Sequence, residues 1–200
     1  MEGKYKLLTE ETIKVDGRTL YRIEAIKDFG NVKKGEKGGY IEKEDNLSHD
    51  GDCWVYDNAK VYDNAEVHDN AQVGGEAEVF CEAWVCSSAW VFDEARVHGT
   101  AWIRDNAQVY GNAEVYGDAR VYDMAWVYSD ARVYGNASVH GMAQVSDNAR
   151  VHGVAWVFDN AWVYGTAEVY GKAKVYEYAS VCGTAKVCGN ANVYEGDIKE

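Results

Sequence analysis

Apolar and polar positions recur with a fixed period of six from Cys53 onwards. The chain reads CWVYDN AKVYDN AEVHDN and continues for twenty-four hexads to ANVYEG at 191–196 without an insertion. The first position is Ala in every hexad except that of Cys53, and the third is Val except at Ile103. The fifth position is mostly Gly or Asp, and the sixth is often Asn.

This pattern predicts a stacked prism of short strands. The Ala and Val of a hexad are two residues apart, so on an extended strand they point to the same side and form the interior. Gly, Asp and Asn accept turn conformations, so each hexad ends in a bend. Three strands per coil give eighteen residues per turn. Eight regular coils stacked at roughly 4.8 Å then make a rod about 38 Å long.

The two ends of the chain lack the regular hexad. TIKVDG followed by RTLYRIEAI predicts a hairpin that turns at Asp16-Gly17. Ile41 and Leu47 keep the six-residue spacing before Cys53, so we expect the coil to begin near Ile41. The predicted organisation is a β cap at 1–40, the solenoid at 41–196 and a charged tail at 197–200. The first forty residues could alternatively form a partner-binding module.

The hexad A-x-V-x-[DG]-[NT] resembles the repeat of left-handed β-helix proteins, over roughly residues 41–196. The lead-in LYRIEAIKDFGNVKKGEKGGYIEKEDNLSHDGDCWVYDNA is similar to that of YdcK-like β-helix proteins of bacteria and their phages, often labelled acyltransferases. The resemblance implies an all-β, single-stranded, left-handed parallel β-helix. The left hand follows from the resemblance alone, since most parallel crossovers are right-handed.

Reading the outward positions every eighteen residues separates three faces. On the first face Trp and Gln alternate at the second hexad position, rings predominate at the fourth, and neither column carries a charge. Exposed aromatic patches of this kind mark interaction surfaces. Alternatively, the rings stack only to stabilise the rod. The predicted interface residues are Trp54, Gln72, Trp90, Phe92, Gln108, Tyr110, Trp126, Tyr128, Gln144, Trp162 and Tyr164.

The other two faces carry charge. The second face mostly alternates in sign, which predicts a solvated charge ladder whose one fault is Arg132 above Arg150. Its members are Lys60, Glu78, Arg96, Glu114, Arg132, Arg150, Glu168 and Lys186. The third face mixes Trp, Arg, Lys, Glu, Ser and Asn without a clear order.

The family resemblance implies one enzymatic alternative. Many left-handed β-helix relatives are trimeric acyltransferases, in which a His between subunits acts as general base and acyl-CoA lies along the helix. This sequence has no inserted loop and no carboxy-terminal helix. Its fourth-position histidines are interchangeable with Tyr: His68, His98, His140 and His152. No catalytic residue and no cofactor are predicted, and a hexapeptide-repeat acyltransferase is kept as the alternative.

No metal site is predicted either. The spacings Cys81-x4-Cys86 and Cys182-x5-Cys188 do not match zinc motifs, and no paired His suggests a carbonic anhydrase. Asp105 and Asp123 should be neighbours and could bridge a hard cation, but Asp is an ordinary turn residue. The odd number of cysteines, five, suits a reducing compartment.

The net charge of −13 disfavours direct binding to nucleic acid or to an anionic membrane. The chain has no apolar run long enough to span a bilayer, and its start lacks the apolar core of a signal peptide, so we expect the cytoplasm. The leading interpretation is a non-catalytic interaction rod that forms a dimer or trimer or binds a protein partner. A phage-encoded inhibitor that occupies a nucleic-acid groove, or a structural component, is one setting.

Overall fold

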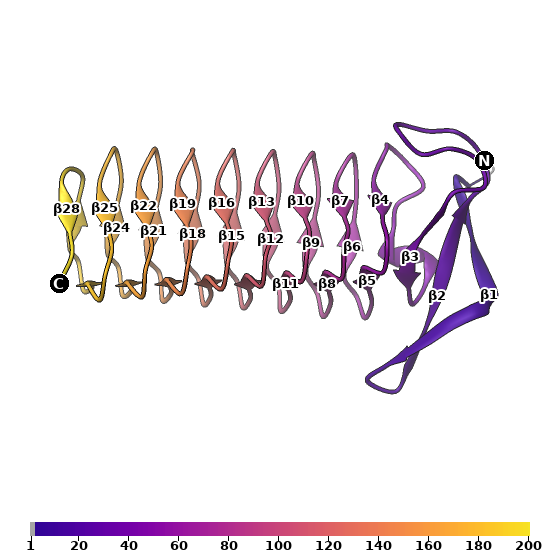
Figure 1. Cartoon of the computed structure of the whole chain (residues 1–200), viewed down its shortest axis with the longest axis horizontal. Helices are drawn as coiled ribbons and strands as arrows, with labels where there is room; N and C mark the ends of the chain where they lie inside the picture. Colours follow the sequence, from indigo (N-terminus) through magenta and orange to yellow (C-terminus); the bar gives the residue numbers. More distant parts are fainter. Residues whose placement is uncertain (1–2) are drawn as a thin grey trace.

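The computed structural model describes residues 3–200, which form a rod of stacked β coils with a hairpin at the amino-terminal end (Figure 1). From Trp54 to Val193 a two-residue strand begins every six residues. Each strand up to Lys174–Val175 pairs in parallel with the strand eighteen residues on, as Trp90 does with Gln108 and Val91 with Val109. The predicted parallel β-solenoid with an eighteen-residue coil is therefore confirmed, with about nine turns. The hand of the coil stays a prediction from the resemblance.

The strands form three sheets, one per face. The first sheet contains β4 (Trp54–Val55), β7 (Gln72–Val73), β10 (Trp90–Val91), β13 (Gln108–Val109), β16 (Trp126–Val127), β19 (Gln144–Val145), β22 (Trp162–Val163), β25 (Ser180–Val181) and β28 (Asp197–Ile198). The second contains β1 (Tyr5–Val15), β2 (Arg18–Ala25), β3 (Lys37–Ile41), β5 (Lys60–Val61), β8 (Glu78–Val79), β11 (Arg96–Val97), β14 (Glu114–Val115), β17 (Arg132–Val133), β20 (Arg150–Val151), β23 (Glu168–Val169) and β26 (Lys186–Val187). The third contains β6 (Glu66–Val67), β9 (Trp84–Val85), β12 (Trp102–Ile103), β15 (Arg120–Val121), β18 (Ser138–Val139), β21 (Trp156–Val157), β24 (Lys174–Val175) and β27 (Asn192–Val193).

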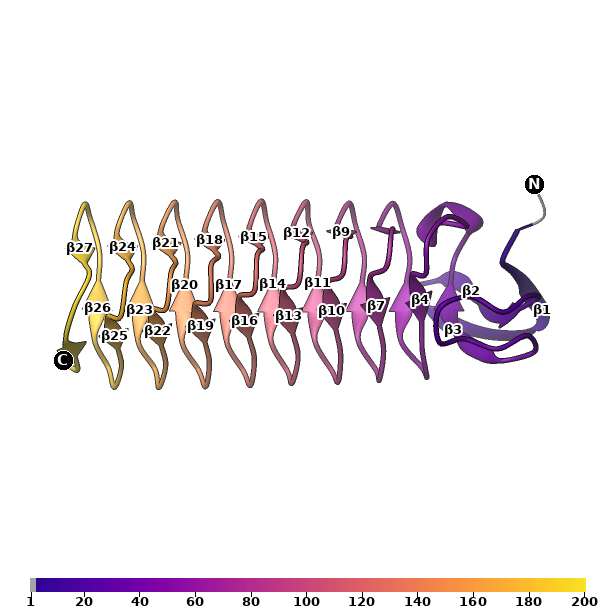
Figure 2. The same ribbon diagram turned by 90° about the horizontal axis from the view of Figure 1, so that it is seen from above.

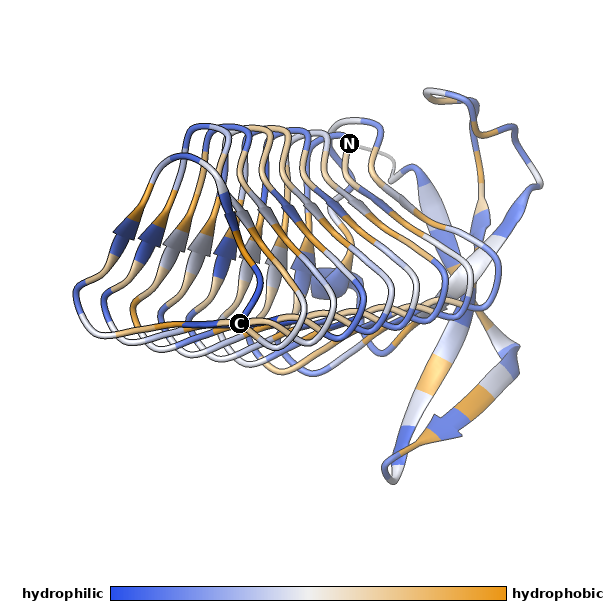
Figure 3. Ribbon diagram, turned by 60° about the vertical axis from the view of Figure 1, so that its left-hand side comes forward, coloured by the Kyte–Doolittle hydropathy of each residue, from blue (hydrophilic) through white to orange (hydrophobic). Residues whose placement is uncertain are grey.

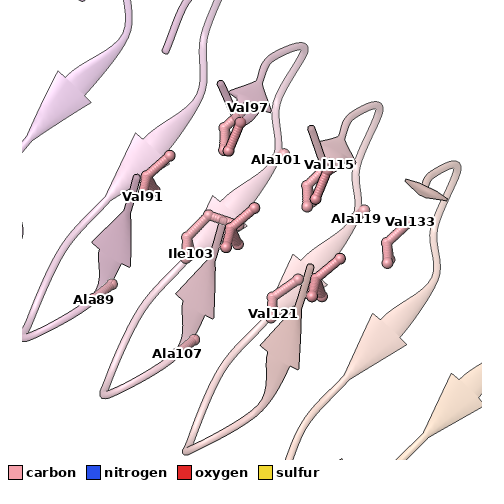
Figure 4. Close-up of a cluster of buried hydrophobic side chains, with 14 of the residues drawn as sticks. Ala89, Val91, Val97, Ala101, Ile103, Ala107, Val115, Ala119, Val121 and Val133 are labelled. Atoms are coloured by element: carbon pink, nitrogen blue, oxygen red, sulfur yellow. The ribbon is translucent and has the colours of Figure 1, made fainter. Parts of the chain in front are cut away.

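The interior is filled by the first and third hexad positions. From Ala59 to Ala185 these Ala and Val side chains are fully buried, as is Ile103. Figure 4 shows Val91, Val97 and Ile103 pointing into the coil from three successive strands, one in each sheet. Positions of like hydropathy line up from coil to coil (Figure 3), because each coil repeats the spacing of the last.

The corners are built at the fifth hexad position, where the backbone is left-handed. Asp147 has φ 56° and Gly153 has φ 71°. Gly and Asp tolerate this conformation better than most residues, which explains their frequency there. An Asp at a corner also accepts a hydrogen bond from the next coil, as Asp147 Oδ2 does from the Gly165 N–H at 2.9 Å. Eight corners carry such a bond, which ties neighbouring coils together.

The amino-terminal segment forms the predicted hairpin and extends the second sheet (Figure 2). Strands β1 and β2 turn at Asp16 and Gly17, whose φ values of 48° and 81° suit a type I′ turn. Strand β2 pairs antiparallel with β3, and β3 pairs in parallel with β5. A single 3-10 turn, η1 (Glu44–Asn46), follows. Within residues 3–200 no helix has the length and apolarity needed to cross a membrane.

The six-residue frame slips at both ends of the rod. Ile41 pairs with Val61 and Leu47 with Val67, each twenty residues on, so both take the third hexad position rather than the first as the sequence spacing suggested. The extra residues lie in the loop before Cys53. At the other end Val181 pairs with Ile198, seventeen residues on, after a turn at Gly196 with φ 80°. Asp197–Ile198 is thus strand β28, whereas the sequence placed these residues in a tail.

Candidate interaction surface

The outer surface of the first sheet is a row of exposed tryptophans separated by glutamines. The parallel register sets Trp90 beside Gln108, Gln108 beside Trp126, Trp126 beside Gln144 and Gln144 beside Trp162. The tryptophans are 47%, 39% and 41% exposed in chain order, and the glutamines are half-buried. We call these five residues the tryptophan ridge. The tryptophans stand on every second coil because they are thirty-six residues apart in the sequence and each coil has eighteen residues.

Two hollows lie along this row. One, of about 230 Å³, is lined by Trp90, Phe92, Gln108, Val109 and Tyr110 together with the charged corner residue Asp93. A second, of about 530 Å³, extends from Gln108 across Trp126 to Gln144 and is also lined by Met124 and Met142. Along the rod the outer surface therefore alternates between long tryptophan and shorter glutamine side chains.

Contacts within the chain hold the rings of this sheet in place. Tyr110 and Tyr128 stack with their centroids 5.1 Å apart, and Tyr110 meets Trp126 edge-on at 6.5 Å. The Tyr128 hydroxyl donates to Gln144 Oε1 at 3.3 Å. Burial raises the pKa of Tyr110, so this ring carries no charge near neutral pH. The surface is uncharged as well as fixed in shape.

Trp54 does not belong to the exposed row, although the sequence included it in the interface. It is completely buried. Phe29 meets its ring edge-on at 5.3 Å, and Tyr5 does so at 6.1 Å. Trp54 therefore anchors the amino-terminal segment on the first coil. The other ten predicted interface residues lie along the one sheet, as the register requires.

The third face also exposes tryptophans: Trp84, Trp102 and Trp156 are 40%, 43% and 43% exposed. Trp84 and Trp102 stack at 5.6 Å with only 10° between their planes. Arg120 lies over Trp102 at 5.8 Å, and Lys174 lies over Trp156 at 5.2 Å. This face therefore carries charged side chains among its exposed rings, as its sequence indicated. The three residues Trp84, Trp102 and Trp156 are natural controls for the tryptophan ridge.

The second face is a charge ladder. Glu78 Oε1 lies 3.3 Å from Lys60 Nζ, and its Oε2 lies 3.5 Å from Arg96 Nε. Glu168 similarly contacts Arg150 at 3.4 Å and Lys186 at 3.1 Å. These groups are partly solvated, and such pairs typically contribute about 0–1 kcal/mol each.

Three of the four fourth-position histidines are layers in ring stacks. His98 lies between Phe80 at 4.7 Å and Tyr116 at 5.0 Å, and burial lowers its pKa. His140 and His152 are stacked in the same way, and burial lowers the pKa of each. These three histidines serve as aromatic layers, which agrees with the presence of Tyr at the same hexad position in other coils.

His68 is different, although it shares the fourth hexad position with the other three histidines. Its Nε2 lies 2.7 Å from Glu66 Oε2. Both residues line a hollow of about 540 Å³ at the seam with the amino-terminal segment, together with Lys43, Ser48 and His49. The sequence contains a sign of this pair. His68 is the only His with an acidic residue two positions before it, and this spacing places both side chains on one side of the strand.

Metal-binding geometry is absent from the part of the chain that the structure describes. No group of three or more His, Cys, Asp or Glu side chains is placed to hold an ion in residues 3–200. Asp105 Oδ2 accepts the Asp123 N–H at 3.3 Å, so this carboxylate serves a corner. All five cysteines are free thiols.

Comparison with known proteins agrees with this architecture. The family model described as the YdcK β-solenoid repeat matches residues 107–123 and 143–157. A protein of Escherichia coli (strain K12), named "Uncharacterized acetyltransferase YdcK", is 37% identical over 65 residues. That match spans 29% of this chain and 20% of the relative's length. The chain is therefore a parallel β-solenoid that is similar to the YdcK β-solenoid repeat over part of its length.

Proposed function

We propose that this protein is a non-catalytic interaction rod that binds another protein surface through the tryptophan ridge. The observation that carries the proposal is the row of half-exposed Trp90, Trp126 and Trp162 on an uncharged sheet. The chain has a net charge of −13 and places charged side chains along its other two faces. Aromatic residues in an uncharged patch are typical of interface cores.

The area of the ridge is large enough to matter for binding. A Trp side chain offers on the order of 250 Å², so covering its exposed part removes roughly 100 Å² of surface from water. At about 25 cal/mol per Å² that contributes roughly 2 kcal/mol for each ring, before the entropic cost of association. The in-chain contacts of Tyr110 and Tyr128 reduce that cost, because the sheet is already ordered.

Oxidative footprinting tests the proposal even while the partner is unidentified. Tryptophan oxidation would be measured by mass spectrometry on dilute purified chain and on the chain in concentrated lysate of the producing cell. We expect Trp90, Trp126 and Trp162 to be protected several-fold more in the lysate than Trp84, Trp102 and Trp156. Equal protection of the two sets would remove the ridge as a binding surface.

A second candidate function is acyl transfer, favoured by the name of the E. coli relative and by the His68–Glu66 pair. Glu66 could orient His68 to accept a proton from a nucleophile that attacks an acyl thioester. Calorimetry with acetyl-CoA, on the wild type and on His68→Gln, tests this function. No heat of binding at millimolar acetyl-CoA removes it, whereas turnover that His68→Gln abolishes and His152→Gln preserves would establish it.

The cellular setting follows the family resemblance. A rigid rod with one uncharged aromatic face would suit a cytoplasmic inhibitor or a structural component of a bacterium or phage. The acidic faces beside the ridge would suit a partner whose nucleic-acid groove is basic.

A further inference from the structure

The spacing of the tryptophan ridge matches a second copy of the same surface. Trp90, Trp126 and Trp162 stand two coils apart, a distance of roughly 9.6 Å at the usual strand separation. Gln72, Gln108 and Gln144 stand one coil out of phase and are more buried than the tryptophans. A surface whose long and short side chains share one period, half a period apart, is complementary to itself.

We propose that the tryptophan ridge binds a second copy of this chain, antiparallel, about a two-fold axis between β13 and β16. In this arrangement Trp126 of each copy lies over Gln108 of the other. Trp90 then lies over Gln144, and Trp162 over Gln72. The same two-fold operation places all three tryptophans of the ridge opposite glutamines. An antiparallel pairing closes on itself, whereas a parallel shift by one coil would leave an open, unpaired end.

The ends of the first sheet fit this register. The axis sets the β4 coil of one copy opposite the β25 coil of the other. At β4 the chain is thick, because Phe29 and Tyr5 cover Trp54. At β25 the two outward columns end in the small residues Ser180 and Cys182. The bulky end of each copy thus meets the flattest part of its neighbour.

Charge selects the same face. Two copies that each carry −13 repel one another unless they meet through uncharged surface. The second face has a charged side chain in every coil from Lys60 to Lys186, and the third face has Glu66, Arg120 and Lys174 among its tryptophans. From β7 to β25 the second and fourth hexad positions of the first sheet carry no charge, and Asp93 lines one of its hollows from a corner.

The contact is modest in size. A strip about 35 Å long and 15 Å wide covers roughly 500 Å² per copy, at the low end for specific association. We therefore expect a reversible dimer that dissociates in the micromolar range. This inference rests on the proposed function, because it names the partner of the same ridge.

Sedimentation equilibrium over a range of concentrations tests the dimer, with the full chain of 22.3 kDa. We expect twice this mass at high concentration. Trp126→Gln should weaken dimerisation at least tenfold. Gln108→Trp should do the same, although it adds an aromatic ring, because it sets Trp against Trp. The double variant restores Trp opposite Gln and should return within about threefold of the wild type.

Two controls keep the test sharp. Ser138→Trp adds a ring to the third face and should leave the dimer unchanged, and thermal unfolding shows that each variant is folded. Tighter association of Gln108→Trp would overturn the proposed register, and a trimer would overturn the two-fold arrangement. If the wild-type chain stays monomeric at high concentration, the tryptophan ridge does not bind a second copy of the chain. Selective protection of the ridge in the lysate would then still support the proposed function, with a different partner.

Discussion

Trp54 and Trp90 occupy the same column of the first sheet two coils apart, yet Trp54 is fully buried and Trp90 is 47% exposed. The difference arises because the amino-terminal segment packs Tyr5 and Phe29 on Trp54 and does not extend to Trp90. One position of the repeat therefore anchors the cap at one end of the rod and is offered to solvent farther along.

This contrast predicts different costs for the same substitution. Trp54→Ala should lower the free energy of unfolding by about 3–5 kcal/mol, as for a buried aromatic. Trp90→Ala should cost about 1 kcal/mol or less, because much of its ring already contacts water. Chemical denaturation of both variants measures the difference. If the two losses are equal, Trp54 does not anchor the segment.

The left-handed corners predict a second contrast. Asp147→Ala loses the bond to the Gly165 N–H and places Ala at φ 56°, which together should cost about 2 kcal/mol. Asp147→Gly loses only the bond and should cost about 1 kcal/mol or less. Thermal unfolding of the two variants measures this difference, and equal losses would show that the backbone conformation at this corner carries no strain.

Gly153 tests the close stacking of the corners. A Cβ there would lie 3.0 Å from the Gly171 nitrogen of the next coil. Gly153→Ala should therefore cost more than Asp147→Ala, since the steric contact adds to the strain at φ 71°. A thermal melting temperature for Gly153→Ala above that of Asp147→Ala would contradict this account.

The narrow core predicts an asymmetry between shrinking and enlarging substitutions. Ile103→Val should lower the free energy of unfolding by about 0.5–1.5 kcal/mol. Val already occupies the third position of all the remaining hexads. Ala119→Leu should cost about 3 kcal/mol or more, since Ala119 is fully buried against the neighbouring coils. Urea denaturation of both variants would show whether the interior has spare volume.

The stacked histidines predict a loss of stability in mild acid. Burial lowers the pKa of His98, His140 and His152 in the folded chain. The unfolded chain, with His pKa values near about 6.5, then binds protons more readily than the folded one. Stability should be unaffected above that value and should fall as the pH drops from about 6.5 through the folded pKa values.

Replacing the three histidines by Tyr, the residue that shares their columns, isolates this effect. The triple variant should flatten the pH dependence of the melting temperature between about pH 7 and 5. His68→Tyr is the matched control, because His68 is not a layer of either stack. An unchanged slope in the triple variant would assign the acid loss to other groups.

The middle of the rod could be predicted from the sequence, because each hexad specifies its own strand and corner. The buried Ala and Val, the corner Asp and Gly residues and the columns of each face all follow from residues close in the chain. The ends could not, because Ile41, Leu47 and Ile198 take their places through the coils they pack against. The six-residue spacing assigned Ile41 and Leu47 to the wrong hexad position for that reason.

The site shows the same division. The repeat alone assigns ten of the expected interface residues to one sheet, because residues eighteen apart in the sequence lie on neighbouring coils of the same face. The burial of Trp54 depends on Tyr5 and Phe29, far away in the sequence. The hollow around His68 and Glu66 depends on how the loop before Cys53 lies beside the first coil. Neither can be read from a hexad alone.

Because Trp and Gln alternate from coil to coil, adding or removing coils has a different effect for odd and even numbers of coils. Loss or duplication of one whole coil would preserve every corner, every buried column and the backbone ladder, yet it would set Trp beside Trp or Gln beside Gln at the junction. Loss or duplication of two coils would preserve the alternation as well. Lineages of such a rod should therefore change length in steps of thirty-six residues wherever the ridge is in use, and in steps of eighteen where it is not.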